Sequence, residues 1–241
     1  MQSRTKPGFP YAAVLNQSSE VLKVIPTKSV DLILSDPPYY DNLAYSELSD
    51  FYHVWLRRLR LGSYYPSMKA HTPMSESLFP SAERPNGTFQ DGLERVFGEC
   101  YRVLKVNGLL VFTFHHRNPS AWVALGSALA KSGLRTTNVF PVRSEGQSQF
   151  HSSEGNLKWD AVFCCRRRPV VSPAAKRPPF LSVIARAESS AETWRQRLRS
   201  AKLAVGTADL ANLRSAFAVM ELSNALAGSG LLHHTLGMLR H

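Results

Sequence analysis

The stretch VDLILSDPPYYDNLAYSELSDFYHVWLRR, residues 30–58, combines a strand, a rigid turn and a helix. Its first residues, Val30 to Ser35, form an apolar run of strand length, which predicts a buried β-strand. The run ends at Asp36, and the two prolines that follow fix the backbone direction and remove two N–H donors. From Leu48 onward, apolar residues recur at helical spacing, and this helix ends in arginines. The stretch therefore predicts a carboxylate and a rigid turn at the end of a sheet strand.

Outward from this stretch, segments with strand and helix patterns alternate along the chain. Strands are predicted at 11–16, 30–35, 109–115, 135–142 and 159–166, and helices near 18–26, 48–60, 88–104, 118–133 and after 207. Asn107-Gly108 is predicted to stop one helix, and Asn118-Pro119 to begin the next. The alternation predicts an α/β fold with a mostly parallel sheet, and the last two strands, which follow each other, predict an antiparallel edge.

The composition favours a polyanionic partner. The 241 residues carry a formal net charge of +11, which points first to nucleic acid and second to an anionic membrane surface. The alternative is a basic surface that serves solubility only. A shift in composition after Arg168 predicts three parts: a catalytic domain over 1–168, a proline-rich basic linker over 169–188 and a helical region over 189–241.

Cysteine usage and hydropathy predict a cytoplasmic protein. The three cysteines form no C-x-x-C pair, so no zinc site is predicted, and they suit a reducing compartment. The neighbouring His115 and His116 are expected to point in opposite directions, as rim residues and not as ligands of a shared metal. The first residues lack the apolar core of a signal peptide, and no run of 18 apolar residues predicts a membrane span.

The turn after residues 30–35 has the chemistry to hold the amino group of a planar base. Asp36 follows the carboxyl end of a buried strand, where open α/β sheets bind ligands. The carbonyls of Pro37 and Pro38 are free to point into a cleft, and Tyr39 offers a flat ring. An exocyclic amino group presents two N–H donors beside a π face, which matches this set. A base that enters such a pocket must first leave its duplex.

The sequence SDPPY at a strand end resembles motif IV of the amino-group DNA methyltransferases, which methylate adenine N6 or cytosine N4 with S-adenosylmethionine. The resemblance implies that Asp36 and the Pro37 carbonyl hold the amino group, with Pro38 completing the turn, and that Tyr39 stacks on the base. It implies catalysis by positioning and charge stabilisation, without a covalent enzyme intermediate.

The longer stretch DPPYYDNLAYSELSDFYHVWLRR is similar to that of large bacterial adenine-specific DNA methylases described as carrying a zinc ribbon. The similarity implies that Tyr40 and Asn42 belong to an extended signature at the DNA, with Asp41 and Tyr45. Arg57 and Arg58 are the predicted phosphate contacts.

The same likeness extends to the later strands. It makes 109–115, 159–166 and 135–142 the last three strands of a class I methyltransferase (Rossmann-like) sheet whose first strands are missing. The basic stretch 166–202 is either a further phosphate-contacting surface or a solvated linker.

The glycine-rich loop by which class I methyltransferases bind S-adenosylmethionine is not evident. One glycine, Gly8, precedes Asp36. Asn16 is either a contact of the cofactor adenine or a turn residue, and Asp36 is a second candidate for the cofactor. The segment LAGSGLL, 226–232, is either a permuted cofactor loop or a connection between helices.

The sequence therefore predicts the later portion of an adenine-specific DNA methyltransferase, or one half of a split enzyme whose second chain carries the glycine-rich loop. The partners expected are DNA and that second chain. The alternatives are a non-catalytic nucleic-acid-binding remnant or subunit, and a cytosine N4 methyltransferase.

Overall fold

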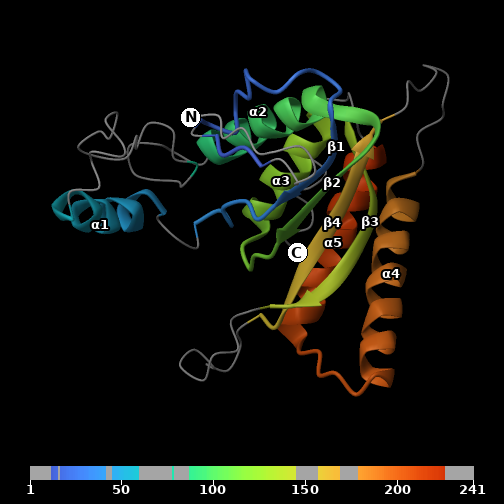
Figure 1. The fold of residues 1–241 in the computed structure, drawn as a ribbon. Helices are drawn as coiled ribbons and strands as arrows, with labels where there is room; N and C mark the ends of the chain where they lie inside the picture. The colour runs from blue at the N-terminus through green and yellow to red at the C-terminus, as the bar shows by residue number, and fades with distance from the viewer. Residues whose placement is uncertain are drawn as a thin grey trace.

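One mixed sheet organises the part of the chain that the computed structural model describes, residues 12–15, 17–41, 45–59, 78, 87–144, 157–168 and 179–225. Its strands lie in the order β1-β2-β4-β3 (Figure 1). Their bounds are β1 Val30–Ser35, β2 Leu104–Phe114, β3 Leu134–Arg143 and β4 Trp159–Arg167. β1 and β2 are parallel, whereas β4 runs antiparallel to both of its neighbours. The antiparallel edge is confirmed, but the prediction of a mostly parallel sheet is wrong, because β4 inserts between β2 and β3. The α/β arrangement is compatible with a partial Rossmann-like fold.

Helices cover one face of this sheet and one edge, and a further helix, the first in the chain, stands apart from it (Figure 1). They are α1 Tyr45–Arg58, α2 Gly87–Val103, α3 Pro119–Lys131, α4 Phe180–Ser200 and α5 Thr207–Ala225. α2, α3 and α5 pack in a row against the strands, and α4 packs on α5 beside β3 (Figure 1). The predicted start of α3 is confirmed, since the Asn118 side chain accepts a hydrogen bond from the Ser120 N–H at 2.9 Å and proline occupies the first turn.

Aromatic rings fill the layer between the sheet and these helices. Phe112 of β2 stacks on Phe163 of β4 with ring centroids 5.0 Å apart, and Phe97 of α2 packs on Phe112 from the helix side. Trp122 of α3 lies edge-on to Phe114 at 5.1 Å. These large apolar side chains are buried together with leucines of α5, so the C-terminal helices share the core of the sheet. Burial of such rings is the main favourable contribution to folding.

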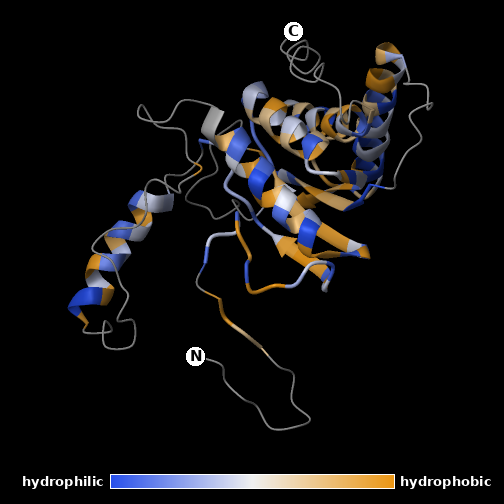
Figure 2. Ribbon diagram, turned by 90° about the horizontal axis from the view of Figure 1, so that it is seen from above, coloured by the Kyte–Doolittle hydropathy of each residue, from blue (hydrophilic) through white to orange (hydrophobic). Residues whose placement is uncertain are grey.

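The β1 side of the sheet is open. Ile33 packs against the core, while its neighbours Leu32 and Leu34 are 49% and 70% exposed. Successive side chains of a strand point to opposite faces, so these leucines lie on the face that α2, α3 and α5 leave uncovered. α1 has no buried residue, and it stands apart from the rest of the fold in both overall views (Figures 1 and 2).

Three predicted boundaries differ from the structure. Residues 12–15 form no strand, because no described strand borders the outer edge of β1, and a strand needs a partner. Residues 17–29 form turns instead of the predicted helix. The helical region begins at Phe180 and not at 189, so the predicted linker 169–188 ends in a helix.

The predicted helix stop at Asn107-Gly108 is also wrong. α2 ends at Val103, and residues 104–108 already belong to β2. The register of the β1–β2 pair jumps between Val30 and Leu32, so β2 carries extra residues there. Gly108 marks this place because a Cβ atom on it would lie 3.0 Å from the Val30 carbonyl oxygen and 2.7 Å from Leu104 Cγ. Glycine therefore permits a close approach of two strands and does not end a helix.

In the described part of the chain, no helix combines the length and the apolar character that a membrane crossing requires.

We expect Gly108→Ala to lower the free energy of unfolding by about 1–3 kcal/mol, because the added methyl group has to displace Leu104 and the β1 backbone. Gly98→Ala is the matched control. Its Cβ would meet nothing within 4 Å inside α2, so this variant should gain about 0.5–1 kcal/mol of stability. Urea unfolding followed by circular dichroism measures both, and equal stabilities of the two variants would contradict the role given to Gly108.

Candidate functional site

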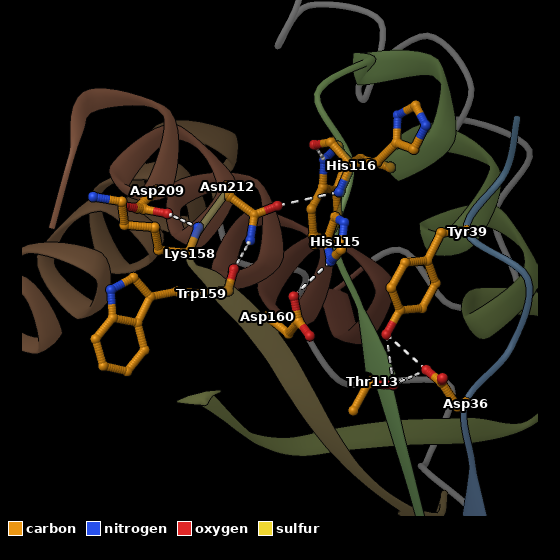
Figure 3. A network of polar contacts seen from close by, with 11 residues as sticks. Asp36, Tyr39, Thr113, His115, His116, Lys158, Trp159, Asp160, Asp209 and Asn212 are labelled. Atoms are coloured by element: carbon orange, nitrogen blue, oxygen red, sulfur yellow. Dashed lines mark hydrogen bonds and ion pairs between the residues drawn. The ribbon is translucent and has the colours of Figure 1, made fainter. Parts of the chain in front are cut away.

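The site lies where β1 and β2 end side by side. Ser35 is in register with Phe112, so the next residues, Asp36 and Thr113, become neighbours at the same edge of the sheet. The Thr113 hydroxyl donates a hydrogen bond to the Asp36 carboxylate. The Tyr39 hydroxyl lies 2.7 Å from Asp36 Oδ1 and 2.7 Å from Thr113 Oγ1 (Figure 3). Two hydroxyl protons serve three contacts, so at most two of the contacts are hydrogen bonds at any moment.

The Tyr39 ring packs against neighbouring rings at this edge of the sheet. It is edge-on to His115, with centroids 4.6 Å apart, and to Phe114 at 5.5 Å. Partial burial raises the pKa of the Tyr39 phenol, and the Asp36 and Asp160 carboxylates raise it further, although the Thr113 hydrogen bond opposes them. Tyr39 therefore stays protonated and acts as a donor. In this conformation its hydroxyl occupies the acceptor that a base amino group would use.

Tyr40 anchors the turn. Its side chain is 4% exposed and packs edge-on to Phe89 of α2, with centroids 5.0 Å apart, and to His116 at 5.5 Å. Its backbone has a φ of 55°, a left-handed conformation that is rare for an aromatic residue and needs support from its surroundings. The role of Tyr40 as a DNA contact stays a prediction, and in this conformation its ring is buried and does not reach the surface.

His116 fixes the end of the turn through Asp41. The His116 Nδ1 atom accepts the N–H of Asn118 at 2.9 Å, so the ring proton sits on Nε2 and is donated to Asp41 Oδ1 at 2.8 Å. Burial lowers the pKa of His116, although the Asp41 carboxylate opposes this shift. The neutral tautomer that the geometry requires is therefore also the form that burial favours.

A further chain of contacts ties this edge to α5. The His116 N–H donates to the Asn212 side-chain oxygen at 3.2 Å, and Asn212 donates to the Trp159 carbonyl at 3.0 Å (Figure 3). His115 Nδ1 lies 2.5 Å from Asp160 Oδ1 at the start of β4. The two neighbouring histidines thus bind different carboxylates, and in the described residues no group of three metal-ligating side chains forms.

Sequence reasoning found Asp36 and Tyr39 and named His116 as a rim residue, but it missed Thr113 and Asp160. A signal for Thr113 was present, since it is the polar residue in an apolar strand that ends at the same sheet edge as Asp36. No signal linked Asp160 or His116 to the turn, because their partners are remote in sequence and β4 reaches the site only through its place in the sheet.

The other predicted residues are not gathered here. Pro37 and Pro38 are half-buried within the turn. Arg57 and Arg58 are exposed at the end of α1, which stands apart from β1 and β2 (Figure 1). Asn16, Asn42 and the segment 226–232 lie outside the described residues.

The described residues do not by themselves form a site for S-adenosylmethionine. Its ribose hydroxyls require a carboxylate acceptor, and Asp36, Asp41 and Asp160 at this edge are each bonded to a neighbouring side chain, with which a ribose hydroxyl would have to compete. Close approach of a phosphate- or carboxylate-like group requires glycine, and no glycine of the described part follows the carboxyl end of a strand. The predicted cofactor contacts of Asn16 and Asp36 therefore stay predictions.

No model of a known protein family matches the chain, and no curated protein matches it. The assignment of a function rests on the turn and its geometry.

We expect His116→Gln to flatten the dependence of stability on pH. Because the pKa of folded His116 lies below that of the unfolded chain, its contribution is complete above the unfolded value of about 6.5 and is lost as the pH falls towards the folded value. The wild type should therefore lose more stability between about pH 7.5 and 5.5 than the variant does. Urea unfolding at both pH values measures this difference.

His53→Gln, on α1, is the control and should keep the pH dependence of the wild type. A His116→Gln profile parallel to that of the wild type would show that His116 is not held neutral.

Proposed function

We propose that this chain is the base-binding part of an S-adenosylmethionine-dependent DNA methyltransferase that acts on adenine N6. One observation carries the proposal: the Asp-Pro-Pro-Tyr turn leaves the carboxyl end of β1 with Asp36 and Tyr39 in hydrogen-bond contact at an exposed edge. The spatial order β2-β4-β3 adds support, because it is the order that the resemblance to class I methyltransferases gives to these strands.

The residues of the turn would bind and orient the amino group. Asp36 and the Pro37 carbonyl are two acceptors for its two N–H donors, so both protons are directed and the nitrogen is fixed in place. Thr113 keeps one Asp36 oxygen oriented through its own hydroxyl. Positioning of this kind strengthens an otherwise weak nucleophile without a covalent enzyme intermediate.

Entry of the base would require Tyr39 to move. Its hydroxyl contacts Asp36 in the present conformation, and the incoming amino group competes for the same oxygen. Release from Asp36 would turn the Tyr39 ring from the edge of His115 towards the base, on which it would stack. The cost of losing the tyrosine hydrogen bond is offset by the bonds to the amino group.

A segment that carries the glycine-rich loop, either in a second chain or in a longer form of this chain, is the proposed source of the cofactor site. Two features support this proposal. In the described part of the chain, no strand pairs with the outer edge of β1, and Leu32 and Leu34 are exposed beside it. Parallel strands are normally buried on both faces, so a further parallel strand with its helix would complete β1. Its carboxyl end would then lie next to Asp36.

DNA is the proposed substrate. The net charge of +11 favours a polyanion, and Arg57 and Arg58 end α1 as exposed cations. Cytosine N4 is the alternative target, because its amino group presents the same donors. The lack of a cofactor site in the described residues favours, as a second candidate, a non-catalytic DNA-binding subunit.

The test is a chromosomal Asp36→Asn substitution in the native host, which keeps every partner in place. Sequencing that reads modified bases, with mass spectrometry of the nucleosides, measures N6-methyladenine and N4-methylcytosine. We expect at least one methylated sequence motif to fall about 100-fold or more, since loss of one preorganised electrostatic contact costs that much. Asp31→Asn on β1 is the control. The Asp31 carboxylate lies 2.7 Å from Lys105 Nζ, and this ion pair is not part of the site.

Loss of an N4-methylcytosine motif instead would identify the other target base. Unchanged methylation in the Asp36→Asn strain would overturn the enzyme proposal and leave the DNA-binding subunit.

A further inference from the structure

A recess lies between α4 and β3, the edge strand of the sheet that is opposite to β1. Its volume is about 270 Å³. Val139 of β3 and Phe217 of α5, both buried, form its floor. The Phe140 and Trp194 rings form its walls, with centroids 6.0 Å apart at 84°. We call it the α4 groove.

The rim of the α4 groove is polar and basic. The Arg197 guanidinium lies 5.2 Å from the centre of the Trp194 ring, a cation–π contact. Among the described residues, Arg197 forms no ion pair with a carboxylate, whereas Arg186 and Arg195 on the same helix do. Ser189 and Ser190 add hydroxyls beside it. The groove thus offers aromatic surface beside a cation that no carboxylate of the described residues pairs with.

The local structure of β3 opens the groove. Its register with β4 shifts between Thr136 and Asn138, so the strand carries a bulge at the groove, as strands often do next to binding sites. Asn138 is exposed there, and its amide is both a donor and an acceptor. Phe140 remains 39% exposed although Trp194 is beside it.

The α4 groove lies level with the candidate site across the sheet, since Phe140 is in register with Val162 of β4 and Val162 with Thr113 of β2. The connection after α4 contains Ala204, whose carbonyl accepts the Trp159 indole N–H at 3.0 Å. Trp159 begins β4, and the next residue, Asp160, bonds to His115 beside Tyr39. β1 and β3 are three strand spacings apart, a distance of about 14 Å. About four base steps of one DNA strand cover the same distance.

We propose that the α4 groove binds an unpaired nucleotide of a DNA strand. The base packs against Phe140 and Trp194, the Asn138 amide reaches its edge, and Arg197 contacts a phosphate. Stacking on aromatic rings beside a basic track is how proteins hold single strands without a fixed sequence. The chemistry of the groove calls for a single-stranded nucleic acid, and that the strand is DNA rests on the function proposed above. When a base is extruded from the duplex at Asp36, the α4 groove would hold another nucleotide of the opened DNA.

The test measures binding of the full chain to labelled oligo(dT) of about 16 nucleotides by fluorescence anisotropy. An abasic strand of the same length carries the phosphates without the bases. We expect the wild type to prefer oligo(dT), and Trp194→Leu to weaken oligo(dT) binding about tenfold while abasic-strand binding changes by less than about twofold. Trp194→Phe, which keeps a ring, should retain most of the affinity and guards against a folding defect.

Arg197→Gln should weaken binding of both strands and reduce the slope of log affinity against log salt by about 1. Arg214→Gln is the matched control, since Arg214 is exposed on α5 outside the groove and loses the same charge. It should change the affinity by less than about twofold.

Equal binding of oligo(dT) and the abasic strand by the wild type would overturn the proposal, and so would wild-type affinity in Trp194→Leu. Tighter binding of oligo(U) than of oligo(dT) would assign the groove to RNA and overturn the DNA proposal. Asp31→Asn, which alters a carboxylate paired with Lys105 away from the groove, should leave oligo(dT) binding unchanged. The oligo(dT) comparison reports on the groove and the methylation assay on the turn, so the two proposals fail or stand separately.

Discussion

The parallel pairing of β1 with β2 is the constraint on which the candidate site depends. β1 is joined to the described sheet along one edge, and its register sets Ser35 beside Phe112. Asp36 and Thr113 meet because both strands end at the same edge. A slip of one residue would turn Thr113 to the opposite face, so the hydroxyl that orients Asp36 would be lost. Gly108 makes this pairing possible, since a side chain there would push β1 away.

In the described residues, helices cover one face of the sheet only. The side chains on its two faces therefore have different surroundings. Large rings such as Phe112 and Phe163 face α2, α3 and α5 and form the core. Leu32 and Leu34 face the opposite side and remain exposed. The two proposals use opposite edges of the sheet, the turn after β1 at one and the α4 groove beside β3 at the other. A DNA strand that crosses the end of the sheet would meet both.

The sequence predicted those parts of the site that are close in the chain. Asp36 and Tyr39 are three residues apart, and a rigid proline turn between them leaves few conformations. The contacts of Thr113 with Asp36 and of His116 with Asp41 span more than 70 residues. Local patterns carry no information on such pairs. They also could not show that the Tyr39 hydroxyl contacts Asp36, because that contact forms only with Thr113 and His115 around it.

The sequence by itself determined the β1 strand, the proline turn, the Asn118 cap of α3 and the helical pattern of α5, because short-range backbone preferences and side-chain periodicity decide these elements. Tertiary structure alone decided that 12–15 form no strand and that Tyr40 is buried against α2. Strand pairing and burial depend on contacts between distant segments, and only the folded chain brings these segments together.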